Sequence, residues 1–248
     1  MKKKLKLFKQ GFEIKKFNFK EIKTIKFLKS KLTNYSKKKL NTKGKLKLEN
    51  IHQVDVENFN DYRIDVISFL NSIPGIRKKL FNILEKHLVE LFGKDISMQK
   101  YINLSIQRPL DFERTPMHSD APSHSLYEVA IWLPLVNCKR TMGMYYFPIN
   151  KTTQARKFVL NCNSKNPDKF SKKNGIIPNV RFGEFVIFWT KCFHYIPVNQ
   201  ENVSRWSLNF RYKNTFSPYS KKGYLDYYEP VSYSDITEMV LSNEQKKQ

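Results

Sequence analysis

Hydrophobic and polar residues follow two different periods along this chain. Between residues 75 and 92, apolar residues recur every three to four positions, which predicts an amphipathic helix. Pro74 lies near its start and Gly93 directly after it, as is typical of helix ends. A second helix is predicted over 60–71. The apolar stripe of the longer helix comprises Ile76, Leu80, Phe81, Ile83, Leu84, Leu88, Leu91 and Phe92.

From about residue 100 the period changes to two. Short apolar or alternating segments are separated there by Pro, Gly, Asn and Lys, which predicts a series of strands. The predicted strands are 101–107, 127–136, 144–147, 157–161, 183–189, 193–196 and 204–212. Because no helical pattern lies between most of them, they favour a mainly β sandwich or barrel with an N-terminal helical layer.

The first 48 residues have a weaker pattern and a strong charge. Apolar residues at near-helical spacing over 19–32 predict a short amphipathic helix, which either packs on the domain or contacts an anionic surface. Packing is the favoured interpretation. We therefore divide the chain into a basic N-terminal appendage, 1–48, and a domain over 49–248 that ends in a tail with a short helix predicted from Asp235.

Charge and cysteine content narrow the class of protein. The net charge is +23, and the first 50 residues, with 18 Lys, no Arg and 3 Glu, account for +15 of it. Such basicity raises the question of nucleic acid or membrane, but the domain itself holds little of it, and an AT-rich genome also produces Lys-rich chains. The three cysteines form no CxxC pair, which favours a reducing compartment. No apolar run is long enough for a membrane span or a signal peptide, so a cytoplasmic protein is expected.

Two histidines and one aspartate form the strongest candidate for chemistry. In an extended segment His118 and Asp120 project to the same side, so that an imidazole and a carboxylate converge. An HxD pair alone is common. His194 follows the fully apolar segment 183–189 and is well placed to project into a barrel interior. Together the three side chains predict a 2-His-1-carboxylate metal site, which is typical of non-haem Fe(II) oxygenases. His52, His87 and His124 are expected to be structural or exposed.

The strand predicted over 204–212 has one polar face. Arg205, Ser207, Asn209 and Arg211 share that face. The strand is either a sheet edge with its polar face in water or a central strand whose polar face lines a cavity. In the second case Arg205 would bind a carboxylate in a bidentate manner, with Ser207 donating a further hydrogen bond.

These motifs resemble a known superfamily. HxD, a distal His and R-x-S eleven residues later are similar to the 2-oxoglutarate/Fe(II)-dependent dioxygenases, with the spacing of the phytanoyl-CoA hydroxylase-like branch. Segments 103–111 and 127–135, followed by Met144-Tyr145, resemble the sporadically distributed carbohydrate-cluster oxygenases of that superfamily. The resemblance covers about residues 50–215. Segment 147–151, FPINK, departs from the Pro-x-Ser-His-like turn of phytanoyl-type relatives, so substrate contacts cannot be transferred.

The resemblance implies a fold and an activity. The fold would be a double-stranded β-helix (jelly-roll, cupin-like) core. His118, Asp120 and His194 would bind Fe(II), while Arg205 and Ser207 would hold 2-oxoglutarate as the cosubstrate used with O₂. The substrate would be a small molecule, nucleotide sugar or glycan, hydroxylated in surface-polysaccharide biosynthesis. Related halogenases have Ala or Gly in the position of Asp120, so hydroxylation is expected here.

Three other interpretations stay open. Arg205 and Arg211 are six residues apart, as in alkylation-repair demethylases of nucleic acids, although the chain has no recognisable lid for a flipped base and its first Arg lies closer to the distal His than we expect for that family. A non-catalytic cupin-like metal-binding module is the alternative from another class. Peripheral membrane contact through the basic N-terminus would accompany an enzymatic activity and would not replace it.

Gln107 and Asn103 are further candidates for 2-oxoglutarate contacts.

Overall fold

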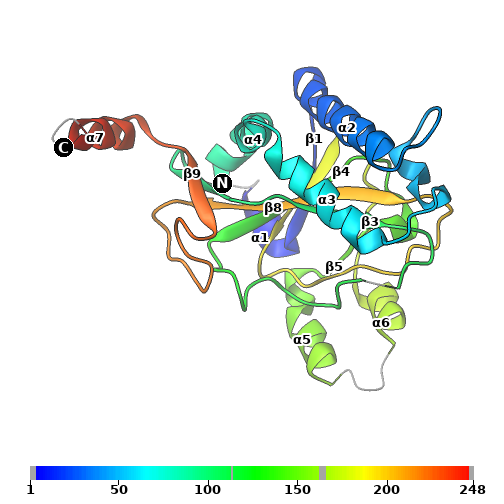
Figure 1. Ribbon diagram of the computed structural model, residues 1–248. Helices are drawn as coiled ribbons and strands as arrows, with labels where there is room; N and C mark the ends of the chain where they lie inside the picture. Colours follow the sequence, from blue (N-terminus) through cyan, green and yellow to red (C-terminus); the bar gives the residue numbers. More distant parts are fainter. Residues whose placement is uncertain (1–3, 113, 162–165, 246–248) are drawn as a thin grey trace.

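An antiparallel sheet of seven strands forms the centre of the molecule (Figure 1). The computed structural model describes residues 4–112, 114–161 and 166–245. The strands of this sheet follow the order β1-β6-β4-β8-β2-β9, and β3 pairs with β8 beside β2. Strands β5 and β7 form a separate pair. The strands are β1 Phe12–Lys16, β2 Ile96–Gln99, β3 Asn103–Gln107, β4 Glu128–Pro134, β5 Tyr145–Tyr146, β6 Glu184–Trp189, β7 His194–Tyr195, β8 Arg205–Asn214 and β9 Tyr228–Ser232.

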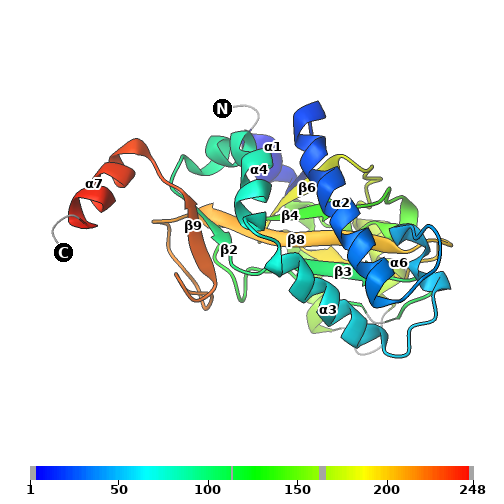
Figure 2. The ribbon, with the colours of Figure 1, turned by 45° about the horizontal axis from the view of Figure 1, so that its top comes forward.

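Helices α2, α3 and α4 cover one face of this sheet (Figure 2). Their apolar stripes bury Ile25, Leu28 and Leu32 of α2 and Leu80 and Leu84 of α4, all fully. The helix predictions over 60–71 and 75–92 are confirmed, and so is the packing of the basic amphipathic helix. The helices are α1 Lys4–Gln10, α2 Phe19–Lys39, α3 Phe59–Ser72, α4 Ile76–Phe92, α5 Thr152–Leu160, α6 Pro167–Asn174 and α7 Asp235–Gln245, with 3-10 turns at Leu48–Gln53, Arg140–Met142 and Ile149–Lys151.

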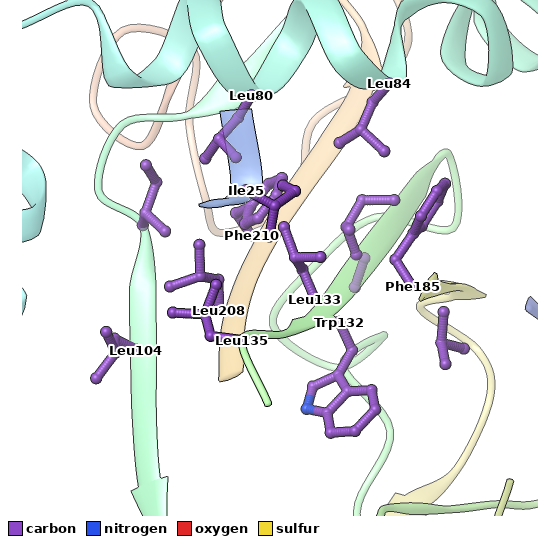
Figure 3. Packing of buried hydrophobic residues seen from close by; sticks show 14 of the residues in the cluster. Ile25, Leu80, Leu84, Leu104, Trp132, Leu133, Leu135, Phe185, Leu208 and Phe210 are labelled. Atoms are coloured by element: carbon purple, nitrogen blue, oxygen red, sulfur yellow. The ribbon is translucent and has the colours of Figure 1, made fainter. Parts of the chain in front are cut away.

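Strand β8 is central, and both of its faces are buried. Leu208 and Phe210 point toward the helices, where they meet Ile25, Leu80 and Leu84 (Figure 3). The side chains of the opposite face, from Arg205 to Arg211, point away from the helices because successive side chains of a strand alternate. Burial of Arg205 to 1% exposure rules out the interpretation of this strand as a sheet edge in water.

The N-terminal segment contributes to the same core. Residues 12–16 pair with 184–188 in antiparallel register, and Phe12 and Phe17 are buried together with the apolar face of α2. The side chain of Asn18 caps α2, and Glu21 completes a capping box. The boundary at residue 48 therefore marks a change in charge, while one sheet and one core join the two sides of it.

One of the predicted strands is a helix in the structure. Residues 157–161 were expected to form a strand, and that prediction is wrong, because Thr152–Leu160 is helix α5. Ala155 and Phe158 are buried at helical spacing, and Phe158 stacks on Phe170 of α6 at 4.1 Å between ring centroids. Packing against a second helix thus outweighs the β propensity of Phe and Val.

Among the described helices, none has the length and apolar content that crossing a membrane requires.

Candidate metal and 2-oxoglutarate site

The three predicted metal ligands lie together between the two sheets. His118 and His194 face each other in an antiparallel bridge, with the N–H of His194 donating to the carbonyl of His118 at 2.8 Å. Nε2 of His118 lies 3.4 Å from Oδ1 of Asp120. One ligand atom from each of the three residues can be chosen so that all lie within 4.8 Å of one another. The structure therefore brings together the residues that a single metal ion requires.

Each histidine is oriented by a backbone carbonyl. Nδ1 of His118 lies 2.8 Å from the carbonyl oxygen of Pro116, and Nδ1 of His194 lies 3.1 Å from that of Cys192. A carbonyl oxygen can only accept, so each Nδ1 is the protonated nitrogen that donates to it. In the neutral form of each ring, Nε2 then carries the lone pair, which is how metal-binding histidines are usually held. In the ligand-free structure Nε2 of His118 faces Oδ1 of Asp120.

Asp120 is fixed by Arg211. Nη2 and Nε of Arg211 donate to Oδ2 of Asp120 at 2.7 and 3.1 Å, and Nη1 lies 3.3 Å from the side-chain oxygen of Gln99. Both partners of this ion pair are buried. Because Arg211 occupies Oδ2, the other oxygen of Asp120 remains for a metal ion. The six-residue spacing in the sequence did not predict this pairing.

Burial and neighbouring groups set the protonation of the three ligands. Burial alone would lower the pKa of His118, but its hydrogen bonds with Asp120 and with the carbonyl of Pro116 raise it. Burial alone would raise the pKa of Asp120, but hydrogen bonds and charges from His118, Arg211 and His194 hold it well below its usual value. Burial and the nearby His118 lower the pKa of His194 to about 4. At neutral pH the site thus offers an ionised carboxylate and a neutral His194, the forms that bind metals.

Arg205 lies on the same buried face, but its charge is not paired. Its guanidinium donates to the hydroxyl of Ser105 at 3.1 Å and to the carbonyl of Gly143 at 3.5 Å. Its Nε has no hydrogen-bond partner, and no acidic side chain of the described residues forms an ion pair with it. The burial of this cation lowers its pKa. Ser207, the second predicted 2-oxoglutarate contact, also has a buried hydroxyl without a partner.

Two further residues at this place were not singled out as contacts from the sequence. Tyr146 is opposite His194 in the β5–β7 pair, so both side chains point to the same side. Its hydroxyl is buried without a hydrogen-bond partner, and the charge of Arg205 acts on its pKa, which burial raises. Ser105 contacts Arg205 directly. Both could have been found only from strand pairing, which joins residues far apart in the sequence.

A cavity of about 350 Å³ lies beside Arg205. Arg205, Gln107 and Ser105 line it, as do Pro116 and Ile196. The carbonyl oxygen of Pro116 lies 2.8 Å from Nδ1 of His118, so the cavity adjoins the segment that carries this ligand. Gln107 therefore lies at the site, whereas Asn103 is exposed at the other end of β3.

A second cavity, of about 390 Å³, adjoins the first, since Arg114 and Pro116 line both. Met117 and Tyr195 line it, and they are the immediate neighbours of His118 and His194. Adjacent residues of a strand point to opposite faces, so this cavity lies on the outer side of the small sheet. Helices α5 and α6 cover that side (Figure 1).

The remaining histidines have structural contacts. His124 is buried, contrary to the expectation of an exposed loop residue, and its Nδ1 lies 2.9 Å from Oε2 of Glu128. Nδ1 of His52 lies 3.0 Å from the hydroxyl of Ser204. His87 packs edge-on against Phe185. None of the three joins the group formed by His118, Asp120 and His194.

Solved structures share this architecture at low sequence identity. The non-heme monooxygenase ThoJ in its nickel complex is 14% identical, with a TM-score of 0.56 over 92% of this chain and 83% of that chain. HygX from Streptomyces hygroscopicus, with nickel and 2-oxoglutarate bound, is 11% identical, with a TM-score of 0.56 over 91% of each chain. EvdO2 from Micromonospora carbonacea var. aurantiaca, complexed with 2-oxoglutarate, is 12% identical, with a TM-score of 0.50 over 94% of this chain and 93% of that chain.

These similarities establish the fold. No family profile matches the sequence, and neither does any curated protein. The chain thus has the fold of non-heme oxygenases, some of which have been solved with iron or nickel and with 2-oxoglutarate. Within that fold, His118, Asp120 and His194 can hold a metal ion.

Proposed function

We propose that this protein is an Fe(II)- and 2-oxoglutarate-dependent dioxygenase with a double-stranded β-helix core. The observation that supports this most is the buried cation of Arg205, which has no ion pair with the described residues and lines a cavity together with Pro116, the residue whose carbonyl orients His118. A buried charge without a counter-ion is costly, so the site favours an anionic ligand. 2-Oxoglutarate has two carboxylates, one for an arginine and one for a metal ion.

His118, Asp120 and His194 would hold the iron, and their donor set fits Fe(II). Arg205 and Ser207 would bind the distal carboxylate of 2-oxoglutarate, and the hydroxyl of Tyr146 would donate a third hydrogen bond. The unpaired polar atoms of these three residues fit that role, because an anion would satisfy all of them at once. When bound, iron and 2-oxoglutarate supply the oxidising chemistry with O₂, and the chain supplies orientation and a buried cavity.

For the substrate we propose a small molecule or sugar-related metabolite, hydroxylated in surface-polysaccharide biosynthesis. The support for it is the similarity of segments 103–111 and 127–135 to carbohydrate-cluster oxygenases. For the compartment we propose the cytoplasm, because Cys138 and Cys192 are free and buried.

The test is an anaerobic titration of the Fe(II)-loaded protein with 2-oxoglutarate, followed by visible absorption. We expect a weak metal-to-ligand charge-transfer band that His194→Ala abolishes. The matched control is His87→Ala, which removes a histidine that packs on Phe185 and should keep the band.

The alternatives give different results. If iron binds and no band appears, the oxygenase proposal fails and a cupin-like metal-binding module becomes the leading interpretation. If the band appears, nucleotide sugars and methylated oligonucleotides are compared as substrates by succinate release. Turnover of the oligonucleotides alone would favour the nucleic-acid demethylase.

A further inference from the structure

The outward face of helix α2 is a continuous basic stripe. Helix α2 spans 21 residues, or about 30 Å at 1.5 Å per residue. The exposed side chains fall on one side of it, opposite the buried Ile25, Leu28 and Leu32. We call this side the α2 stripe. Its charged and aromatic members are Phe19, Lys20, Lys23, Lys26, Phe27, Lys31, Lys37 and Lys38.

No acidic residue belongs to the α2 stripe. Glu21, the acid of this helix, is half-buried, forms the capping box and pairs with Lys86 of α4. Lys29 and Lys39 lie beside the stripe and are paired with Glu49 and Asp65. The six lysines of the stripe have no ion pair with the residues that the structure describes. Their charge is thus available to an external anionic partner.

Two phenylalanines stand out from this basic surface. Phe19 is 76% exposed and Phe27 is 39% exposed. Lys23 lies over the ring of Phe19 at 5.2 Å and Lys31 over that of Phe27 at 5.5 Å. Large apolar side chains that alternate with lysines along one face are typical of helices that lie in a membrane interface, with the rings between the headgroups.

The choice of lysine favours lipid over nucleic acid. Residues 1–50 contain 18 Lys and no Arg. Arginine is the residue preferred for nucleic-acid recognition, because its planar group binds phosphate in a bidentate manner and stacks on bases. Polybasic lysine clusters beside apolar side chains suffice for anionic membrane surfaces, where each lysine adds attraction without a defined geometry.

We propose that the α2 stripe binds the surface of a membrane that contains anionic lipids, with Phe19 and Phe27 inserted among the headgroups. The stripe and the metal ligands lie on opposite faces of the large sheet. Helix α2 covers the face of Leu208 and Phe210 (Figures 2 and 3). Arg211, which contacts Asp120, projects from the other face because side chains alternate along β8. The site thus faces away from the bilayer, so this contact localises the protein and leaves the site open to a water-soluble substrate.

The test is cosedimentation of the full-length protein with phosphatidylcholine vesicles, with and without about a third of phosphatidylglycerol, at about 0.1 M salt. We expect binding only to the anionic vesicles. The triple variant Lys20→Gln, Lys23→Gln, Lys26→Gln should weaken it at least about tenfold, and so should Phe19→Ser with Phe27→Ser. The matched control, Lys169→Gln, Lys172→Gln, Lys173→Gln on the exposed side of α6, changes the net charge equally and should reduce binding less than about threefold.

Two results would overturn the proposal. Equal losses in the α2 and α6 variants would mean that net charge alone attracts the protein. Binding to a single-stranded oligonucleotide that is tighter than binding to anionic vesicles, and lost with the α2 variant, would assign the stripe to nucleic acid. Thermal unfolding checks that each variant is folded. The test needs no iron or 2-oxoglutarate, so its result is independent of the proposed enzyme activity.

Discussion

Two arginines of strand β8 occupy the same buried face, six residues apart, in opposite electrostatic situations. Arg211 has its counter-ion within the chain, since two of its nitrogens contact Oδ2 of Asp120. Arg205 is 1% exposed, and among the described residues its guanidinium hydrogen-bonds to Ser105 and to the carbonyl of Gly143, with no ion pair. Burial acts to lower both pKa values, yet Asp120 raises that of Arg211 while that of Arg205 stays lowered.

The difference indicates what each end of the strand is for. A complete ion pair belongs to the permanent structure, and here it holds a candidate metal ligand in place. A buried charge without a counter-ion makes the folding of the ligand-free protein less favourable than a paired charge would. Such an arrangement is understandable where an anionic ligand completes it, which is the role proposed for 2-oxoglutarate. Three changes test this comparison.

The largest effect is expected from Arg211→Met. The substitution leaves the Asp120 carboxylate buried without its counter-ion, and breaking a buried pair in this way costs about 3–5 kcal/mol. Urea unfolding of the metal-free protein at neutral pH should show a loss of that size, and a divalent metal ion should recover part of it. The control is Arg156→Met on the exposed side of α5, which should change stability by less than about 0.5 kcal/mol. A loss below about 1 kcal/mol for Arg211→Met would show that Asp120 does not depend on the pair.

Arg205→Met should give the opposite sign in the same unfolding experiment. Because it removes a buried charge that has no anion, the free energy of unfolding of the ligand-free protein should stay the same or rise. The affinity for 2-oxoglutarate, measured by titration of the Fe(II) protein without O₂, should fall about 100-fold, equivalent to about 3 kcal/mol. Unchanged affinity would place the carboxylate elsewhere in the cavity, and marked destabilisation would mean that Arg205 is structural.

The smallest effects are expected from Tyr146→Phe and Ser207→Ala. Each removes one buried hydroxyl that has no partner, so the stability of the ligand-free protein should not fall. Each should raise the dissociation constant for 2-oxoglutarate about tenfold, or about 1.5 kcal/mol, the lower end of the contribution of one hydrogen bond to a charged group. Tyr145→Phe is the control, because the side chain of Tyr145 belongs to the cluster on the outer side of the small sheet. Equal effects of Tyr145→Phe and Tyr146→Phe would argue against a contact from Tyr146.

Local periodicity explains which parts of the fold were predictable. The helices over 60–71 and 75–92 have apolar stripes of their own, so their prediction needed no knowledge of the rest of the chain. Strands β1, β2 and β9 were not predicted, since each is short and forms only by pairing with a distant strand. The strand predicted at 157–161 was wrong, because its residues pack against α6 as a helix.

The sequence by itself determined which residue types could bind a metal ion and an anion, and on which side of a strand they lie. Side chains at i and i+2 share a face in any extended segment, so His118 with Asp120, and Arg205 with Ser207, follow from spacing alone. The place of His194 after the apolar segment 183–189 made it the candidate third ligand, and the structure brings it to the first pair. Only the tertiary structure decided that Arg211 is bound to Asp120 and that Tyr146 and Ser105 lie near Arg205. The physical reason is that strand pairing brings together residues a hundred and more positions apart. Burial of a charge then makes its stability depend on whether it has a partner.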